Sequence, residues 1–107
     1  MKDLTKIEEI LLIIIWRLKD EAYGVKIRQH VSTLIGKEFT YGNLYSALSQ
    51  LTHKNYVIKR EGETIPERRG RPRIAYEIAP LGFSALKETQ EMNETLWSGI
   101  SKFAFDK

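Results

Sequence analysis

The stretch Phe39–Tyr56 carries the side chains whose types and spacing best fit a recognition chemistry. Read as a helix, it places Leu44, Leu48 and Leu51 on one face, which predicts a core stripe. The other side is small and polar: Gly42, Ser46, Ser49 and His53, flanked by Tyr41, Asn43, Tyr45 and Gln50. A face of hydroxyls, amides and tyrosines without carboxylates can approach a polyanion and hydrogen-bond to base edges. We therefore interpret the stretch as a DNA recognition helix.

The residues that we expect to contact base edges, the candidate readers, lie in the N-terminal half of this helix, because recognition helices contact base edges with that half. They are Thr40, Tyr41, Asn43, Tyr45 and Ser46. Asn43 is the strongest candidate for direct readout, through two hydrogen bonds between its amide and an adenine. The alternative is that Tyr45 packs against its own domain and that Asn43 serves only the first-turn capping.

A second cluster, RRGRPR at residues 68–73, holds four arginines and no acidic residue. Residues 1–22 carry four Lys or Arg against five Asp or Glu, and residues 79–107 carry three against four. Because the positive charge is local, it indicates an anionic partner at one part of the molecule. The candidate phosphate or minor-groove contacts are Arg68, Arg69, Arg71 and Arg73. Further candidates for backbone contact are Lys26, Arg28, Lys59 and Arg60. A solvated run of charges is the alternative.

Two helices are expected before the recognition helix. Thr5 and Glu8 form a capping box, which predicts a helix to about Leu18. Its middle, Ile10–Trp16, is apolar at every position, so we expect it to contact a second partner; a buried strand is the alternative. The next helix runs over residues 23–34 and stops at Gly36. A short turn, in which Thr40 is a natural N-cap, completes a helix-turn-helix.

After the recognition helix we expect a β-hairpin, the wing, and a long final helix. Apolar and charged residues alternate in Val57–Glu63 and in Ile74–Ile78, which predicts two antiparallel strands joined by the basic loop. From about Leu81 to Phe105 the apolar residues keep 3-4 spacing, which is typical of a coiled-coil seam. The expected fold is thus mainly α with a small β-hairpin (α+β): a winged helix-turn-helix domain, residues 1–79, and a C-terminal dimerisation helix, residues 80–107.

The apolar surfaces of the two chain ends predict a homodimer, in which the final helix of one subunit packs on the first helix of its partner. The candidate dimerisation residues are Ile10, Ile14, Leu86, Leu96, Trp97, Ile100 and Phe103.

Composition and residue spacing argue against several other classes of function. The chain has 107 residues, no cysteine and a net charge of +3, which fits one folded domain in a reducing cytoplasm. The longest apolar run is too short to cross a membrane, and its flanks do not form a signal peptide. His30 and His53 stand apart from other ligands, so no metal or cofactor is expected. No nucleophile stands beside a suitable base, so we do not expect an enzyme.

Several local strings resemble the PadR family of bacterial transcriptional regulators across essentially the whole chain. They are LTKIEEILLIIIWRL, AYGVKI, FTYGNLYSALSQL, KNYVIKREGE and YEIAPLG. The resemblance implies a winged helix-turn-helix with a C-terminal dimerisation helix. One departure is the wing, RRGRPRIAY, where many members have a GGR-type string that ends in two aromatic residues.

The single C-terminal helix is similar to that of the short-tailed subfamily, some of whose members are multidrug-sensing repressors. In those proteins a tryptophan of this helix pairs with that of the partner subunit and holds flat aromatic ligands. Trp97, in TLWSGISKF, matches that tryptophan, and the implied effector site is Asn93, Trp97 and Ile100. A purely structural role for Trp97 in the interface is the alternative.

These features together predict a cytoplasmic, homodimeric repressor that binds a pseudo-palindromic DNA operator and is released by a small aromatic effector. A winged-helix module that binds protein instead of DNA is the alternative.

Overall fold

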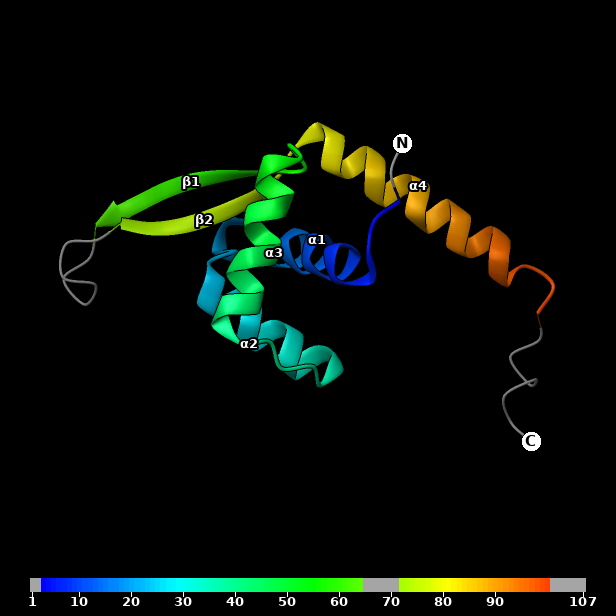
Figure 1. Ribbon diagram of the computed structural model, residues 1–107, viewed down its shortest axis with the longest axis horizontal. Helices are drawn as coiled ribbons and strands as arrows, with labels where there is room; N and C mark the ends of the chain where they lie inside the picture. Colours follow the sequence, from blue (N-terminus) through cyan, green and yellow to red (C-terminus); the bar gives the residue numbers. More distant parts are fainter. Residues whose placement is uncertain (1–2, 65–71, 101–107) are drawn as a thin grey trace.

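The computed structural model describes residues 3–64 and 72–100, and it forms a helical core with a two-stranded hairpin (Figure 1). The elements follow in the order α1 (Lys6–Leu18), the 3-10 turn η1 (Lys19–Glu21), α2 (Gly24–Ile35), α3 (Tyr41–His53), β1 (Val57–Thr64), β2 (Pro72–Ile78) and α4 (Pro80–Trp97). The hairpin and α4 project from the core in opposite directions, so the molecule is elongated, with extents of 54 × 31 × 22 Å. This confirms the predicted winged helix-turn-helix.

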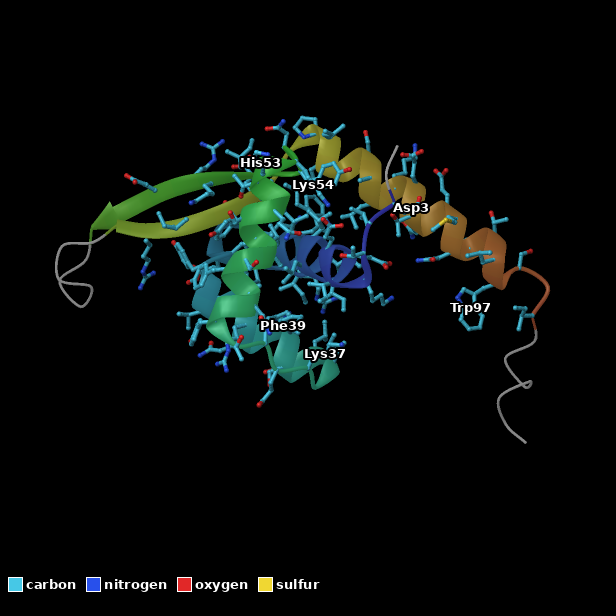
Figure 2. All side chains as sticks on the ribbon, viewed as in Figure 1. Asp3, Lys37, Phe39, His53, Lys54 and Trp97 are labelled. Atoms are coloured by element: carbon cyan, nitrogen blue, oxygen red, sulfur yellow. The ribbon has the colours of Figure 1, made fainter. Side chains whose placement is uncertain are left out.

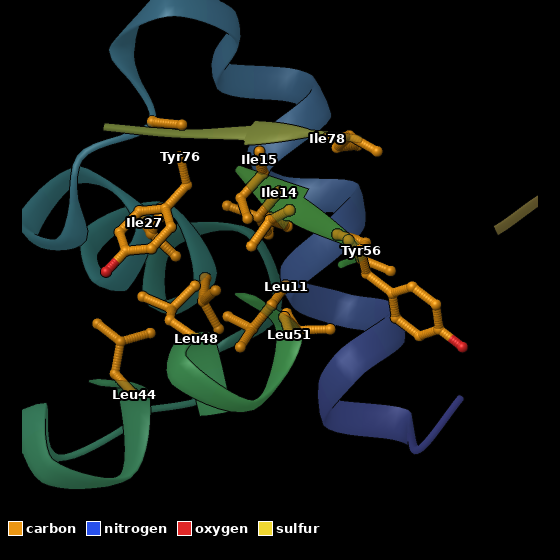
Figure 3. Close-up of a cluster of buried hydrophobic side chains, with 14 of the residues drawn as sticks. Leu11, Ile14, Ile15, Ile27, Leu44, Leu48, Leu51, Tyr56, Tyr76 and Ile78 are labelled. Atoms are coloured by element: carbon orange, nitrogen blue, oxygen red, sulfur yellow. The ribbon is translucent and has the colours of Figure 1, made fainter. Parts of the chain in front are cut away.

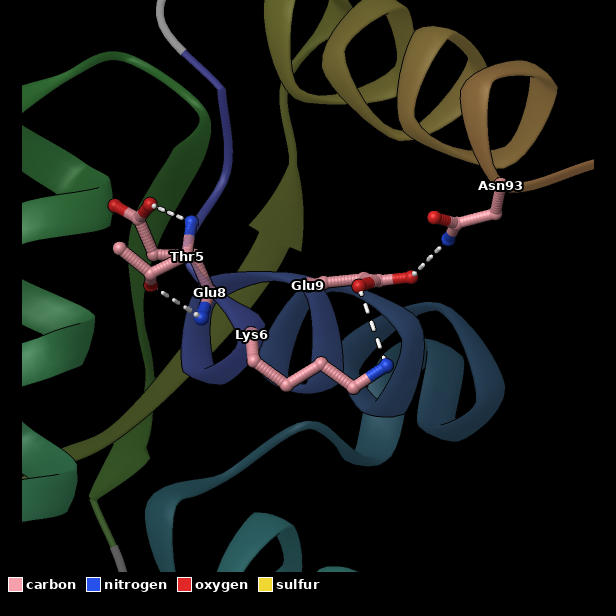
Figure 4. A network of polar contacts seen from close by, with 5 residues as sticks. All are labelled: Thr5, Lys6, Glu8, Glu9 and Asn93. Carbon is pink, nitrogen blue, oxygen red and sulfur yellow. Dashed lines mark hydrogen bonds and ion pairs between the residues drawn. The ribbon is translucent and has the colours of Figure 1, made fainter. Parts of the chain in front are cut away.

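Local capping sets the ends of the first two helices, as predicted. The Thr5 hydroxyl accepts the Glu8 N–H at 3.1 Å, and the Glu8 carboxylate accepts the Thr5 N–H at 2.9 Å, which completes the capping box (Figure 4). α2 ends where Gly36 takes a left-handed conformation with φ of 71°, which a residue without Cβ adopts at little cost.

The hairpin is antiparallel, and its register runs from Val57 opposite Ile78 to Glu61 opposite Ile74. The alternation of apolar and charged residues predicted Val57–Glu63 and Ile74–Ile78, so β1 is longer by one residue and β2 by two. A bridge between Tyr23 and Ala75 joins β2 to the chain just before α2. The Tyr76 N–H also donates to the Ala22 carbonyl at 2.9 Å, so the base of the wing is hydrogen-bonded to the helix-turn-helix.

The core lies where α1, α2 and α3 meet the base of the hairpin (Figure 3). Its fully buried large side chains are Leu11, Leu12, Ile15, Ile27, Val31, Leu44, Leu48 and Leu51. The predicted leucine stripe of α3 is therefore confirmed. Ile14 is only 2% exposed and belongs to this core, so its surface is already used within its own chain. Little of the Ile14 side chain is therefore left for the predicted subunit interface; the exposed apolar side chains of α1 are Ile7, Ile13 and Trp16.

α4 is shorter than its apolar spacing predicted. The helix ends at Trp97 and not near Phe105, because Ser98 has extended backbone angles and Gly99 has φ of 81°. Serine and glycine are poor residues for a helix interior, and here they outweigh the apolar spacing that continues through Ile100. Phe103 lies outside the described residues.

Candidate nucleic-acid interface

The outer face of α3 is small, polar and free of acidic residues. A helix advances 100° per residue, so Gly42, Ser46, Ser49 and His53 lie opposite the leucine stripe. All four are exposed, and none of the residues Tyr41–His53 is Asp or Glu. With side chains this short, the helix backbone can come close to a groove lined with phosphates without electrostatic repulsion.

The predicted readers fall on three parts of this helix. The Thr40 hydroxyl is the N-cap and accepts the Asn43 N–H at 3.1 Å, so Thr40 has a structural role. Ser46 lies on the outer face, and Asn43 lies on the flank beside α1. Tyr41 and Tyr45 lie on the other flank, where both contact α2 although each is 44% exposed.

A groove with a positive lining lies between α2, α3 and the hairpin. It has a volume of about 570 Å³, and its charged side chains in the described part of the chain are Lys26, Lys59 and Arg73. Tyr45 of α3 also lines this groove, which places the basic side chains directly beside the recognition helix. The groove therefore offers cations to a phosphate backbone at the flank of α3.

Two of the three groove cations have either a weak ionic partner or an aromatic partner. Lys26 pairs with Glu21 at 3.5 Å, and both side chains are more than half exposed, so water screens the pair. The Arg73 guanidinium lies 4.9 Å from the centre of the Tyr23 ring. Tyr76 forms part of the wall, and its burial, with a smaller effect of the neighbouring Tyr45, raises the pKa of its hydroxyl.

The other predicted basic residues are placed differently. Arg60 hydrogen-bonds to Glu77 across the hairpin, and because both side chains are more than half exposed, water screens this pair as well. Arg28 donates from its Nε to the Phe39 carbonyl, inside the helix-turn-helix. Arg68, Arg69 and Arg71 lie outside the described residues. The Arg60–Glu77 pair and the Arg28–Phe39 hydrogen bond could not be predicted from the sequence, because each joins residues more than ten positions apart.

A second groove, of about 700 Å³, lies between α1 and α4 and is lined by two of the three predicted effector residues, Asn93 and Trp97. Its aromatic lining is Trp16, Phe83 and Trp97, and the first two rings meet edge to face with centres 4.9 Å apart. Asn93 donates to Glu9 at 3.2 Å, which links α4 to α1 (Figure 4). Trp97 stands at the far end of α4 (Figure 2), and Ile100, half exposed, follows the helix end. The repeat of apolar residues had not singled out Trp16 or Phe83.

Two further observations concern other classes of site. Among residues 3–64 and 72–100, no group of three His, Cys, Asp or Glu side chains could hold a metal ion. Within the same ranges, no helix combines the length and the apolar character that a membrane span requires.

Comparison with known proteins gives a family match. A model described as the transcriptional regulator PadR-like family matches residues 11–88. No curated protein is significantly similar to the chain.

Several solved structures share the fold. A PadR family transcription regulator from Clostridium difficile is 20% identical, with a TM-score of 0.74 over 94% of this chain and 99% of that chain. A transcriptional regulator from Clostridium thermocellum is 27% identical, with a TM-score of 0.69 over 91% of each chain. F93 from STIV, a winged-helix DNA-binding protein, is 13% identical, with a TM-score of 0.70 over 92% of this chain and 98% of that chain.

Proposed function

Because the chain belongs to the PadR-like family of transcriptional regulators, we propose that it is a homodimeric repressor that binds a pseudo-palindromic operator. The observation that supports this most is the acid-free face of α3 beside a groove lined by Lys26, Lys59 and Arg73. The helix would enter the major groove, Asn43 and Ser46 would contact base edges, and the three cations would contact the flanking backbone. The arginines at residues 68–71 would extend these contacts beyond the described hairpin.

Two copies of α3 would read two half-sites. Several of the exposed apolar side chains lie on α1 and near the end of α4: Ile13, Trp16, Met92, Leu96 and Trp97. Each is 40–65% exposed, so burying the exposed part on a second copy would contribute roughly half of the ~1.5–3 kcal/mol that full burial gives, and the sum over two subunits is enough for stable association. Residues 80–107 would then form the dimerisation segment. Ile10 and Leu86 pack partly against the core and would contribute less.

Selection from a random duplex pool tests this function. The selected sequences should be pseudo-palindromic, and footprinting should protect two half-sites about one helical turn, roughly 10 base pairs, apart. Binding should weaken steeply as salt is raised, because phosphate contacts release counterions. Enrichment of no sequence, together with absence of binding at low salt, would exclude DNA readout.

We further propose that the α1–α4 groove holds a planar aromatic effector that releases the DNA. Trp16, Phe83 and Trp97 supply flat surfaces. The charged lining holds two carboxylates, Glu9 and Glu94, against one cation, Lys87, which favours a ligand with positive charge. An effector between α1 and α4 would change the spacing of the two recognition helices, and unequal affinity for the two spacings would shift the equilibrium.

Tryptophan fluorescence tests the effector site, because both tryptophans of the chain line the groove. Planar aromatic cations should quench the emission and lower the affinity for the selected duplex in the same concentration range. In a Trp97→Phe variant the remaining emission comes from Trp16, so the signals of the two tryptophans can be separated. If no compound in a broad panel changes the emission or the DNA affinity, the groove has no sensor role.

A further inference from the structure

Two residues of α2 and two residues of α3 form a closed set of contacts at the helix-turn-helix. Gly24 and Arg28 lie one turn apart on α2, and Tyr41 and Tyr45 lie one turn apart on α3. The Arg28 guanidinium carbon lies 4.6 Å from the centre of the Tyr41 ring. The Tyr41 and Tyr45 rings are stacked, with centres 6.3 Å apart and planes 20° apart. We call these four residues the tyrosine clasp.

Tyr45 closes the clasp against the start of α2. A Cβ atom built on Gly24 would lie 2.2 Å from the Tyr45 hydroxyl oxygen and 2.8 Å from the ring carbon that carries it. Any side chain at this position would therefore displace Tyr45. The clasp fixes the flank of α3 over its first two turns, where the candidate readers Asn43 and Ser46 also lie.

Arg28 is the member of the tyrosine clasp that also makes a hydrogen bond outside it. Its Nε donates to the Phe39 carbonyl at 2.5 Å, one residue before the N-cap Thr40. Phe39 is partly buried and packs against the core, so this bond fixes the chain where it enters α3. A guanidinium can lie over a ring and donate from Nε at the same time, whereas a lysine ammonium lacks both the plane and the Nε–H.

We propose that Arg28 is a positioning residue, which holds α3 in the orientation required for DNA binding, and not one of the phosphate contacts. This inference rests on the proposed function, since it assigns a task within DNA binding. The guanidinium face and the Nε–H of Arg28 are both used within the chain. The cations that line the basic groove, by contrast, are Lys26, Lys59 and Arg73.

A charge-conserving substitution separates positioning from phosphate contact. Arg28→Lys keeps the cation, so a phosphate contact would survive, whereas the clasp would be lost. The affinity for a selected duplex should fall by about tenfold to a hundredfold, with an unchanged slope of affinity against salt concentration. Lys59→Gln serves as the matched comparison, and its slope should fall in magnitude by about 0.9. Wild-type affinity in Arg28→Lys would overturn the proposal.

The other member of the ring contact gives an independent check. Tyr41→Phe keeps the ring under Arg28, so without DNA the amide exchange rates at the start of α3 should stay within about twofold of wild type. Tyr41→Leu removes the ring and should speed this exchange as Arg28→Lys does. If Tyr41→Phe speeds the exchange as much as Tyr41→Leu, then the hydroxyl and not the clasp is what matters, and the proposal fails.

A measurement without DNA keeps this inference apart from the proposed function. The Asn43 and Leu44 N–H groups donate to Thr40, to its hydroxyl and its carbonyl respectively, so their hydrogen exchange reports on the start of α3. Arg28→Lys should speed the exchange of both by about tenfold or more while the amides of α1 keep their rates. Unchanged exchange at Asn43 and Leu44 would overturn the positioning role whether or not the protein binds DNA. Failure of the wild type to bind any duplex would instead reject the proposed function.

Discussion

At the scale of single residues, Glu8 is the buried charged side chain of the described part of the chain, with 3% of its surface exposed. It caps α1 and also pairs with Lys54 at the end of α3 (Figure 2), so one carboxylate joins the first helix to the recognition helix. Burial acts to raise the pKa of Glu8, but the hydrogen bonds from Lys54 and Thr5 and the charge of Lys54 together lower it below its ordinary value.

A carboxyl with a lowered pKa stabilises the fold above its ordinary pKa, and the contribution disappears as pH falls through the lowered value. Glu8→Gln should therefore cost about 1–3 kcal/mol at about pH 7, and the difference from wild type should shrink at about pH 3. Urea unfolding at the two pH values measures this. Glu61→Gln, at an exposed position of β1, is the control and should change stability little. A difference that stays constant with pH would mean that ionisation of Glu8 is not involved.

Arg73 provides the second prediction at this scale, because it lines the basic groove and its contact among the described residues is with the uncharged ring of Tyr23. Arg73→Gln should weaken binding to all duplexes alike and reduce the salt slope by about 0.9. Arg60→Gln, on the other strand of the hairpin, is the matched control: Arg60 pairs with Glu77 and does not line the basic groove, so the slope should change much less. Equal effects of the two substitutions would mean that net charge alone governs binding.

At the scale of elements, the position of α3 depends on its contact with the start of α2. Gly24→Ala should leave the free energy of unfolding unchanged or raise it by up to about 1 kcal/mol, because alanine is the better helix former and the group it displaces is the end of a side chain. The same change forces Tyr45 off α2, so affinity for the selected duplex should fall. Urea unfolding and duplex titration of the same samples measure the two effects. A parallel loss of stability and affinity would indicate general damage to the fold.

Local signals explain why most element boundaries could be predicted. The Thr5 capping box, the glycine at position 36 and the Thr40 N-cap act within a few residues of each helix end, and the structure has all three. The predicted end of α4 was wrong because the prediction gave apolar spacing more weight than the low helix preference of Ser98 and Gly99. Spacing reports which side chains share a face, but backbone preference decides whether the helix continues.

The partners of charged side chains could not be predicted in the same way. Lys54 and Glu8 are 46 positions apart, and Arg28 and Phe39 are 11 positions apart, so only the packed helices bring them together. Composition identified which residues could contact DNA, whereas the fold gives Arg28 an internal partner and pairs Arg60 with Glu77 on the surface of the hairpin. Residue type therefore limits the chemistry, and topology selects which side chains remain available for it.

At the scale of the whole molecule, large apolar side chains remain exposed on the outer face of α1 and on the C-terminal half of α4. Leu96 is 65% exposed, and Trp16 and Trp97 are at least half exposed. If this surface is the subunit interface, Leu96→Asp should place a carboxylate among apolar side chains, which costs several kcal/mol. The dimer dissociation constant should rise by about a hundredfold or more.

Sedimentation velocity across a concentration series measures that change, with Ser84→Asp as the control. Ser84 lies on the exposed polar side of the same helix and receives the same charge, so its variant should remain a dimer. Leu96 is not part of the core, so Leu96→Asp should keep the wild-type unfolding free energy per subunit at low concentration. The monomer should bind a single half-site as well as the wild type does but lose the added affinity for the complete palindrome, since two linked half-sites bind in concert. A wild type that sediments as a single chain at the highest concentrations would require another explanation for the exposed tryptophans.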